Sequence, residues 1–196
     1  MTGARPYRMT ARAEAAQATA DRVLDVAVDL FSEKPYEKVT LGEVADRASV
    51  TERTVIRRFG SKEMLFVEAM GRAGEEAERD RDTAPVGDVV QAVHQLVAQY
   101  ERWGPSRLRM LSQEDRIPVV AANVEHGRRY HWSWVERTFA PLIDGLTGAP
   151  RKRRIAALVA VTDVYMWKLL RRDLGLSRAD TERVLVELIG GLKGEP

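Results

Sequence analysis

Apolar residues recur at intervals of three and four along almost the whole chain, and no segment alternates cleanly between apolar and polar residues. This spacing places apolar side chains on one face of a helix, whereas a half-buried strand needs alternation. The pattern therefore predicts an all-α fold. The chain has 196 residues, 44% of them hydrophobic and 31% charged, a composition typical of a globular protein whose helices bury a core.

Caps and breakers near the N-terminus indicate three helices in close succession. The first fits residues 16–34, and its apolar stripe includes Val23 and Leu30. The second begins at the capping box Thr40-Leu41-Gly42-Glu43, in which the Thr40 hydroxyl accepts from the Glu43 N–H and the Glu43 carboxylate reaches back. Thr51 is a good N-cap for a third helix that ends at Phe59. Two short helices joined by a turn and braced by a longer one match a helix-turn-helix arrangement.

The remaining chain predicts longer helices separated by glycine and proline. We expect them at residues 86–103, 106–115, 118–146, 151–174 and 177–192, with a kink at Pro141. The predicted domains are a basic flexible arm at residues 1–15, a helix-turn-helix domain at 16–62 and a larger helical domain at 63–196.

Positive charge is concentrated on the third helix and directly after it. Arg53, Arg57, Arg58 and Lys62 lie in a stretch, residues 53–62, that contains no acid, although the whole chain has a net charge of only +2. On a helix, Arg53 and Arg57 share one face while Val55 and Phe59 point the other way. Such a cationic face is either a solvated surface or a DNA-binding surface. The capped helix-turn-helix arrangement favours DNA.

The segment from Arg22 to Leu65 resembles the DNA-binding domain of the TetR (tetracycline repressor) family of bacterial transcription regulators. The resemblance covers about a quarter of the chain and rests on these matches: Ala27, Leu30-Phe31, Thr40 to Ala45, Val50, Thr54, Phe59, Ser61-Lys62-Glu63 and Leu65. Three residues depart from the family pattern. Ser49 and Arg53 stand at positions that are commonly glycine, and Ile56 stands where a phosphate-contacting tyrosine is typical. Ile56 either contacts a thymine methyl group or packs inside.

These observations predict the residues that contact DNA. The candidates for base or groove contacts are Thr51, Glu52, Arg53 and Arg57, since arginine pairs with guanine and glutamate accepts from cytosine in the major groove. The candidates for phosphate contacts are Thr40, Thr54, Arg58 and Lys62, aided by the basic arm with Arg5, Arg8 and Arg12.

The resemblance implies that the larger helical domain binds a small molecule and dimerises through its last two long helices, as in actinobacterial-type members. The candidate interface residues are Ala160, Trp167, Val184, Leu185, Leu188 and Ile189. Large side chains on helices expected to surround a ligand are His94, Trp103, Met110, Trp134, Tyr165 and Met166. Either set can instead be plain core. Aromatic and methionine residues at helical spacing are more often core than pocket, whereas a dimer is still favoured because two recognition helices bind a palindrome better than one. Since few buried cations are evident, we expect an apolar or aromatic effector.

Other classes of function find little support in the sequence. There is no cysteine, no glycine-rich phosphate loop and no pair of histidines spaced as metal ligands, so we expect neither an enzyme nor a cofactor or metal. Without an apolar run of membrane-spanning length or a secretory signal, we expect a cytoplasmic protein. The sequence thus predicts a homodimeric, ligand-responsive repressor released from a palindromic operator. The alternative is a helical small-molecule- or protein-binding module whose helix-turn-helix no longer binds DNA, for which Arg53 and Ile56 are the warning signs.

Overall fold

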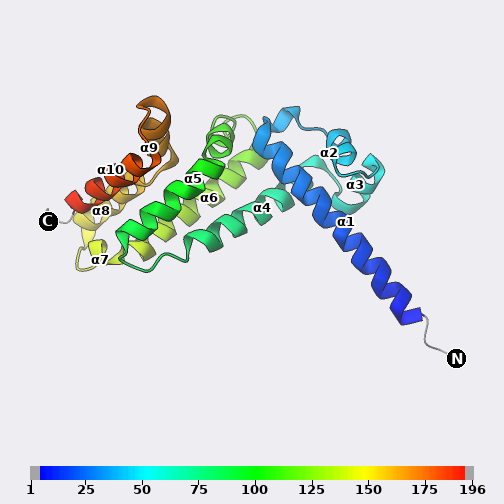
Figure 1. The fold of residues 1–196 in the computed structure, drawn as a ribbon, viewed down its shortest axis with the longest axis horizontal. Coiled ribbons are helices and arrows are strands. Elements are labelled where there is room, and N and C mark those ends of the chain that lie inside the picture. Colours follow the sequence, from blue (N-terminus) through cyan, green and yellow to red (C-terminus); the bar gives the residue numbers. More distant parts are fainter. Residues whose placement is uncertain (1–4, 193–196) are drawn as a thin grey trace. The chain divides into compact units, whose positions relative to one another are not determined.

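The structure, a computed structural model, describes the backbone of residues 5–192 and the side chains of residues 13–192. Throughout these residues the regular elements are helices, which confirms the all-α prediction (Figure 1). The chain divides between Ala73 and Gly74 into two compact units. This division falls later than the predicted domain end at residue 62. No helix in the described part of the chain is both long and apolar enough to cross a membrane.

The first unit contains a long helix, a single 3-10 turn, two short helices and the beginning of another long helix. These elements are α1 (Arg5–Glu33), η1 (Tyr36–Lys38), α2 (Leu41–Arg47), α3 (Glu52–Phe59) and α4 (Lys62–Arg81). Its core includes Leu30, Val44 and Val55, each fully buried. Phe31, Tyr36 and Phe66 add an aromatic cluster with ring centroids 5.0–5.8 Å apart.

The first helix starts earlier than the sequence predicts. The prediction begins it at residue 16 after a flexible arm, whereas α1 begins at Arg5, so the arm is helical from there. Residues 1–4 lie outside the described part, as do the side chains of Arg5, Arg8 and Arg12. Alanine-rich sequence sustains a helix without an apolar stripe, because alanine has the highest helix propensity. The stripe therefore marks where α1 packs and not where it begins.

The second unit contains the end of α4 and the remaining helices. These elements are α5 (Val89–Leu111), α6 (Pro118–Thr138), α7 (Ala140–Ile143), α8 (Gly148–Val161), α9 (Val164–Lys168), the π-helical turn η2 (Leu169–Asp173) and α10 (Arg178–Gly191). In Figure 1, α5 runs beside α6, and α8 beside α10. Their shared core is built around Tyr100, Trp134, Phe139, Trp167 and Leu185.

The predicted break at Gly104-Pro105 is wrong, because α5 continues through both residues. Tertiary packing explains the difference. Tyr100 and Met110 are buried on either side of the proline, so the core holds both halves of the helix in line. The Trp167 ring lies directly on Gly104, where a Cβ atom would meet the ring carbon Cζ3 at only 2.5 Å. Glycine at this position therefore allows a close approach between α5 and α9.

We expect Gly104→Ala to destabilise the protein by about 1–3 kcal/mol, because the rigid indole cannot withdraw from the new methyl group. This loss exceeds the gain of about 1 kcal/mol in helix propensity. Gly127→Ala in α6 is the matched control, since a Cβ there meets no atom within 4 Å. Urea unfolding should show opposite shifts for the two variants. Equal shifts would contradict the packing of Trp167 on Gly104.

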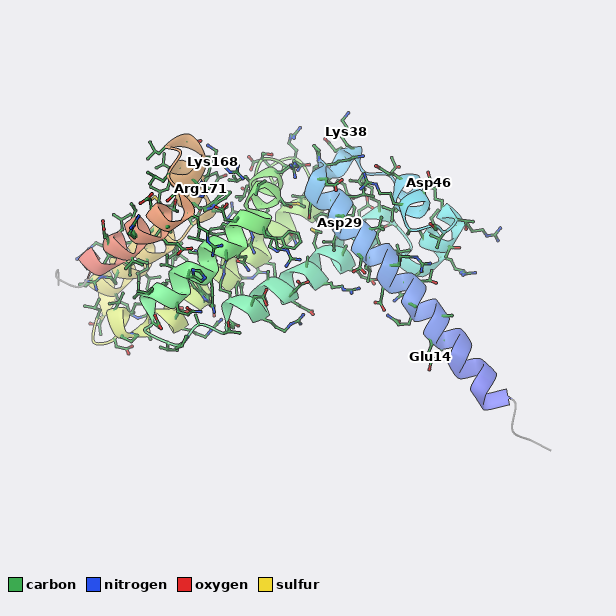
Figure 2. All side chains as sticks on the ribbon, in the orientation of Figure 1. Glu14, Asp29, Lys38, Asp46, Lys168 and Arg171 are labelled. Carbon is green, nitrogen blue, oxygen red and sulfur yellow. The ribbon has the colours of Figure 1, made fainter. Side chains whose placement is uncertain are left out.

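Two other predicted helices are shorter in the structure. The predicted helix 118–146 ends at Thr138 and is followed by the single turn α7, with Pro141 in its first turn. The predicted helix 151–174 is divided after Val161, because the Asp163 side chain accepts from the Tyr165 N–H and starts α9. Beyond α9, Arg171 in η2 forms an ion pair with Glu101 of α5 at 2.7 Å; Lys168 and Arg171 are labelled in Figure 2.

Candidate nucleic-acid interface

The helix-turn-helix begins with a side-chain cap on α2. The Thr40 hydroxyl accepts from the Glu43 N–H at 3.1 Å, as the sequence predicts. The predicted return bond is replaced by ion pairs, because the Glu43 carboxylate contacts Lys34 and also Arg47, the latter at 3.6 Å. Glu43 therefore joins α2 to the end of α1 instead of closing the capping box.

The turn between α2 and α3 contains a strained backbone position. Ser49 has φ 54°, in the left-handed region where non-glycine residues are uncommon. The Val50 N–H donates to the Ala45 carbonyl at 2.9 Å, and the Arg22 side chain of α1 donates to the Ala48 carbonyl at 2.9 Å. These bonds hold the turn in one conformation. Glycine would suit position 49 because it adopts a positive φ without steric cost.

We expect Ser49→Gly to stabilise the protein by about 0.5–1 kcal/mol. A residue with a side chain costs roughly 1–2 kcal/mol in the left-handed conformation, and glycine removes this cost. Glycine also increases the entropy of the unfolded chain, which offsets part of the gain. Ser106→Gly inside α5 is the control and should be destabilising, because glycine lowers helix propensity. Urea denaturation midpoints measure both changes. A midpoint for Ser49→Gly at or below that of the unchanged protein would contradict the strain.

The two faces of α3 differ sharply in burial. Thr51 caps the helix by accepting from the Thr54 N–H at 3.2 Å, and Val55 and Phe59 are buried against the rest of the unit. The opposite face exposes four of the predicted contact residues: Thr51, Glu52, Arg53 and Arg57. The alternative that Ile56 packs inside is wrong, since its side chain is 45% exposed on this same face.

The exposed Ile56 side chain lies on the same face as Arg53 and Arg57, a position that suits contact with a thymine methyl group in the major groove.

The arginines of α3 differ in whether they form ion pairs within the protein. Within the described part of the chain, no acid forms an ion pair with Arg53 or Arg57. Arg58 lies 4.0 Å from Glu68 and over the Phe59 ring. On this face of the described α3, Arg53 and Arg57 are thus without an acidic partner and available for a polyanion.

All four predicted phosphate contacts have a partner inside the unit, since Thr40 caps α2 and Arg58 lies near Glu68. The Thr54 hydroxyl lies 3.0 Å from that of Thr51. The Lys62 ammonium sits over the Tyr36 ring at 4.4 Å and donates to the Glu37 carbonyl at 3.5 Å. Partial burial lowers the pKa of Lys62, and the charges of Glu63 and Glu37 oppose that shift. Thr40 and Arg58 are exposed, so they remain the more accessible phosphate candidates.

The acidic residues of α1 are partly compensated by arginines of the same unit. Arg72 in α4 forms ion pairs with Asp21 and Asp25, each at 3.2 Å, and Arg47 pairs with Glu33 at 3.1 Å. Asp29 is exposed and is labelled on α1 in Figure 2. These pairs tie α1 to α2 and α4 and thereby fix the support on which α3 rests.

The six predicted ligand residues differ in their exposure. His94 and Tyr165 are exposed, Trp103 and Met166 are half-buried, and Met110 and Trp134 are buried. His94 forms a surface contact with Glu182 at 3.2 Å. Trp132 is 48% exposed and Trp134 only 1%, which agrees with their spacing of two on one helix.

The predicted dimer residues also separate into two groups. Trp167, Leu185 and Ile189 are buried in the core of a single chain, so they are not available to a second copy. Ala160 on α8 and Leu188 on α10 are exposed, and Val184 is half-buried. An interface on these helices would therefore be formed by the second group.

Sequence reasoning missed one functional candidate, the buried Arg81 at the end of α4. It lies in the run GRAGEEAERDRD, whose many charges are typical of a solvated helix. Only the folded arrangement distinguishes it from its exposed neighbour Arg79.

A capped short helix, a constrained turn and a second helix with a free cationic face define a helix-turn-helix protein. The family model described as "Bacterial regulatory proteins, tetR family" matches residues 23–69, which span this arrangement. The HTH-type transcriptional repressor KstR of Rhodococcus jostii is 30% identical over 176 residues, covering 87% of this chain and 82% of that protein. The chain therefore belongs to the TetR family of bacterial transcription regulators.

Further comparisons agree with this assignment. KstR of Mycolicibacterium smegmatis is 35% identical over 91 residues, and the match spans 45% of each protein. A crystal structure of a tetR-family transcriptional regulator from Streptomyces coelicolor has a TM-score of 0.73 at 18% identity, covering 90% of this chain and 80% of that one. At this identity the likeness concerns the fold alone.

Proposed function

We propose that the protein is a homodimeric transcriptional repressor that binds a palindromic DNA operator through α3 and is released by a small molecule. The observation that carries the proposal is the exposed face of α3, where Arg53 and Arg57 have no acidic partner in the described chain. The buried Val55 and Phe59 hold the helix firmly from the opposite side. A rigid, cationic helix of this kind fits the major groove.

The base contacts in this proposal come from the exposed face of α3. Arg53 and Arg57 pair with guanine, Glu52 accepts from cytosine, and the exposed Ile56 packs on a thymine methyl group. Thr51 completes the groove contacts. Arg53 and Ile56 both face outward beside Arg57. This arrangement favours DNA binding over the alternative, a binding module whose helix-turn-helix no longer binds DNA.

The phosphate contacts flank these residues. Thr40 lies at the start of α2 and Lys62 at the start of α4, while Thr54 and Arg58 belong to α3. Backbone N–H groups at helix N-termini favour anions, which supports the positions of Thr40 and Lys62. Such contacts hold the protein on the duplex without selecting a sequence.

The dimer in this proposal forms through α8 and α10, with Ala160, Val184 and Leu188 on the shared surface. A symmetric pair places two copies of α3 about 34 Å apart along DNA and so selects a palindrome. The described relatives named KstR are transcriptional repressors, which favours repression. Because α4 begins in the first unit and ends in the second, an effector bound in the second unit can alter α4 and lower operator affinity.

The first test is a fluorescence-anisotropy titration of the purified protein against duplex DNA from upstream of its own gene, over a range of salt concentrations. We expect specific binding that weakens with salt, and Lys62→Ala should reduce the slope of log affinity against log salt by about one unit per protomer. Arg79→Ala, which removes an exposed cation of the second unit, is the control and should leave the slope unchanged. Absence of binding to any duplex at low salt would favour the alternative module, and an unchanged slope would remove Lys62 from the phosphate contacts.

A further inference from the structure

Arg81, in the last turn of α4, is buried in the second unit with only 2% of its surface exposed. Its guanidinium donates to His131 Nδ1 at 3.0 Å and to the Gln99 side-chain oxygen. Its Nε atom is buried and has no hydrogen-bond partner in the described part of the chain. Since arginine stays protonated in proteins, this interior holds a full positive charge and an unused donor.

Aromatic rings surround this charge. The Arg81 guanidinium carbon lies 5.0 Å from the Trp134 ring centroid, 5.6 Å from that of Tyr100 and 5.8 Å from that of Tyr130. The indole N–H of Trp134 is a second buried donor without a partner among the described residues. Two unused donors on neighbouring side chains, within an apolar wall, are typical of a site that receives an acceptor from outside the chain.

The two side chains to which Arg81 donates, His131 and Gln99, are uncharged. Burial, followed by the charges of Arg81 and Arg107, lowers the pKa of His131 to about 3, so its ring is neutral. Arg107 lies over the Tyr100 ring at 5.9 Å. Burial and the charge of Arg81 lower the pKa of Arg107 to about 10, so it remains a second cation near the first at neutral pH.

The acids nearest in sequence to Arg81 have other partners. Glu78 contacts His126 at 3.4 Å, and its charge also acts on Arg107 without forming an ion pair with it. Asp82 pairs with Arg137 at 2.9 Å and accepts from the Tyr130 hydroxyl at 3.0 Å. In the described chain no carboxylate forms an ion pair with Arg81 or Arg107. Because buried charges in proteins are paired or bound to ligands, this excess of positive charge favours an anion.

We propose that the cluster of Arg81, Trp134, Tyr100 and Tyr130 binds the carboxylate of a small organic acid whose remaining body is apolar or aromatic. The carboxylate accepts from Arg81 Nε and the Trp134 indole, and Arg107 adds long-range attraction. The role of this acid as effector rests on the proposed repressor function. Its binding to the second unit does not depend on that function. The proposal also corrects the expectation from sequence, which assumed few buried cations.

The test measures ligand binding to the full chain without DNA. Saturation-transfer NMR and calorimetric titration would be run with linear and aromatic carboxylic acids of about six to twelve carbons and with the matching primary amides. We expect at least one acid to bind about tenfold or more tightly than its amide, because only the acid neutralises Arg81. Acids and amides that bind equally, or a panel in which no acid binds, would overturn the proposal.

Matched variants assign the binding to this cluster. Arg81→Met should weaken the bound acid about tenfold or more, whereas Arg79→Met, an exposed change on the same helix, should leave it unchanged. If circular dichroism shows that Arg81→Met is unfolded, Arg107→Met replaces it and should also weaken the acid and not the amide. Equal binding by the Arg79 and Arg81 variants, or by Arg107→Met and the unchanged chain, contradicts the assignment. Loss of DNA binding would leave these results intact, so the two proposals fail separately.

Discussion

Replacing both Arg53 and Arg57 by alanine should reduce affinity for the operator by about 30-fold or more, since each arginine–guanine pair contributes about 1–3 kcal/mol to base discrimination. Both side chains are exposed on α3 without an acidic partner among the described residues, so the free energy of unfolding should change by less than about 0.5 kcal/mol. Anisotropy titrations with the operator and with an unrelated duplex measure the effect. The operator should lose more affinity than the unrelated duplex.

The matched control removes the same number of charges elsewhere. Arg79 and Arg102 are exposed in the second unit, where each forms a surface ion pair. Their double alanine variant should bind the operator almost as tightly as the unchanged protein. If the two double variants lost equal affinity, net charge and not contact by α3 would account for binding.

Leu188→Arg should convert the dimer into monomers, because symmetry would place an unpaired charge on both sides of the α8–α10 interface. Removing such a charge from water costs several kcal/mol per ion. Leu188 is 43% exposed in the single chain, so the folded protomer should tolerate the change. Sedimentation velocity should report one chain per particle, and affinity for a palindromic operator should fall with the dimer.

Val86→Arg is the control for this variant, since Val86 is 65% exposed and lies outside the two helices. It should remain dimeric. A Leu188→Arg protein that stays dimeric would move the interface away from the α8–α10 surface, whereas an unchanged chain that sediments as a monomer would remove the dimer itself.

The helix-turn-helix could be predicted closely from sequence because local interactions determine it. Side-chain caps at Thr40 and Thr51 start α2 and α3, and the last residue of α3 is the predicted Phe59. Alternation of buried and exposed positions within α3 follows from its period of 3.6 residues. The burial of Val55 and the exposure of Arg57 therefore needed no knowledge of distant contacts.

The structure of the second unit was predicted less well, because contacts between residues far apart in the sequence determine it. Gly104-Pro105 has the local chemistry of a break, yet packing against Trp167 keeps α5 continuous. Arg81 and Arg79 have the same side chain on one charged helix, but only Arg81 meets Trp134 and His131, which come from α6. The sequence predicted large aromatic residues in the second unit but not the cation that they surround.

The most direct test of whether two copies of α3 contact DNA bases together is a selection experiment. The unchanged protein is used to select duplexes from a random pool, at low salt and without added small molecules. We expect enrichment of a two-fold symmetric sequence, with half-sites whose centres are separated by about one helical turn or a multiple of it. Arg53→Ala with Arg57→Ala should abolish that enrichment. A pool that remains random after selection with the unchanged protein, or enriches a single asymmetric site, would contradict this expectation.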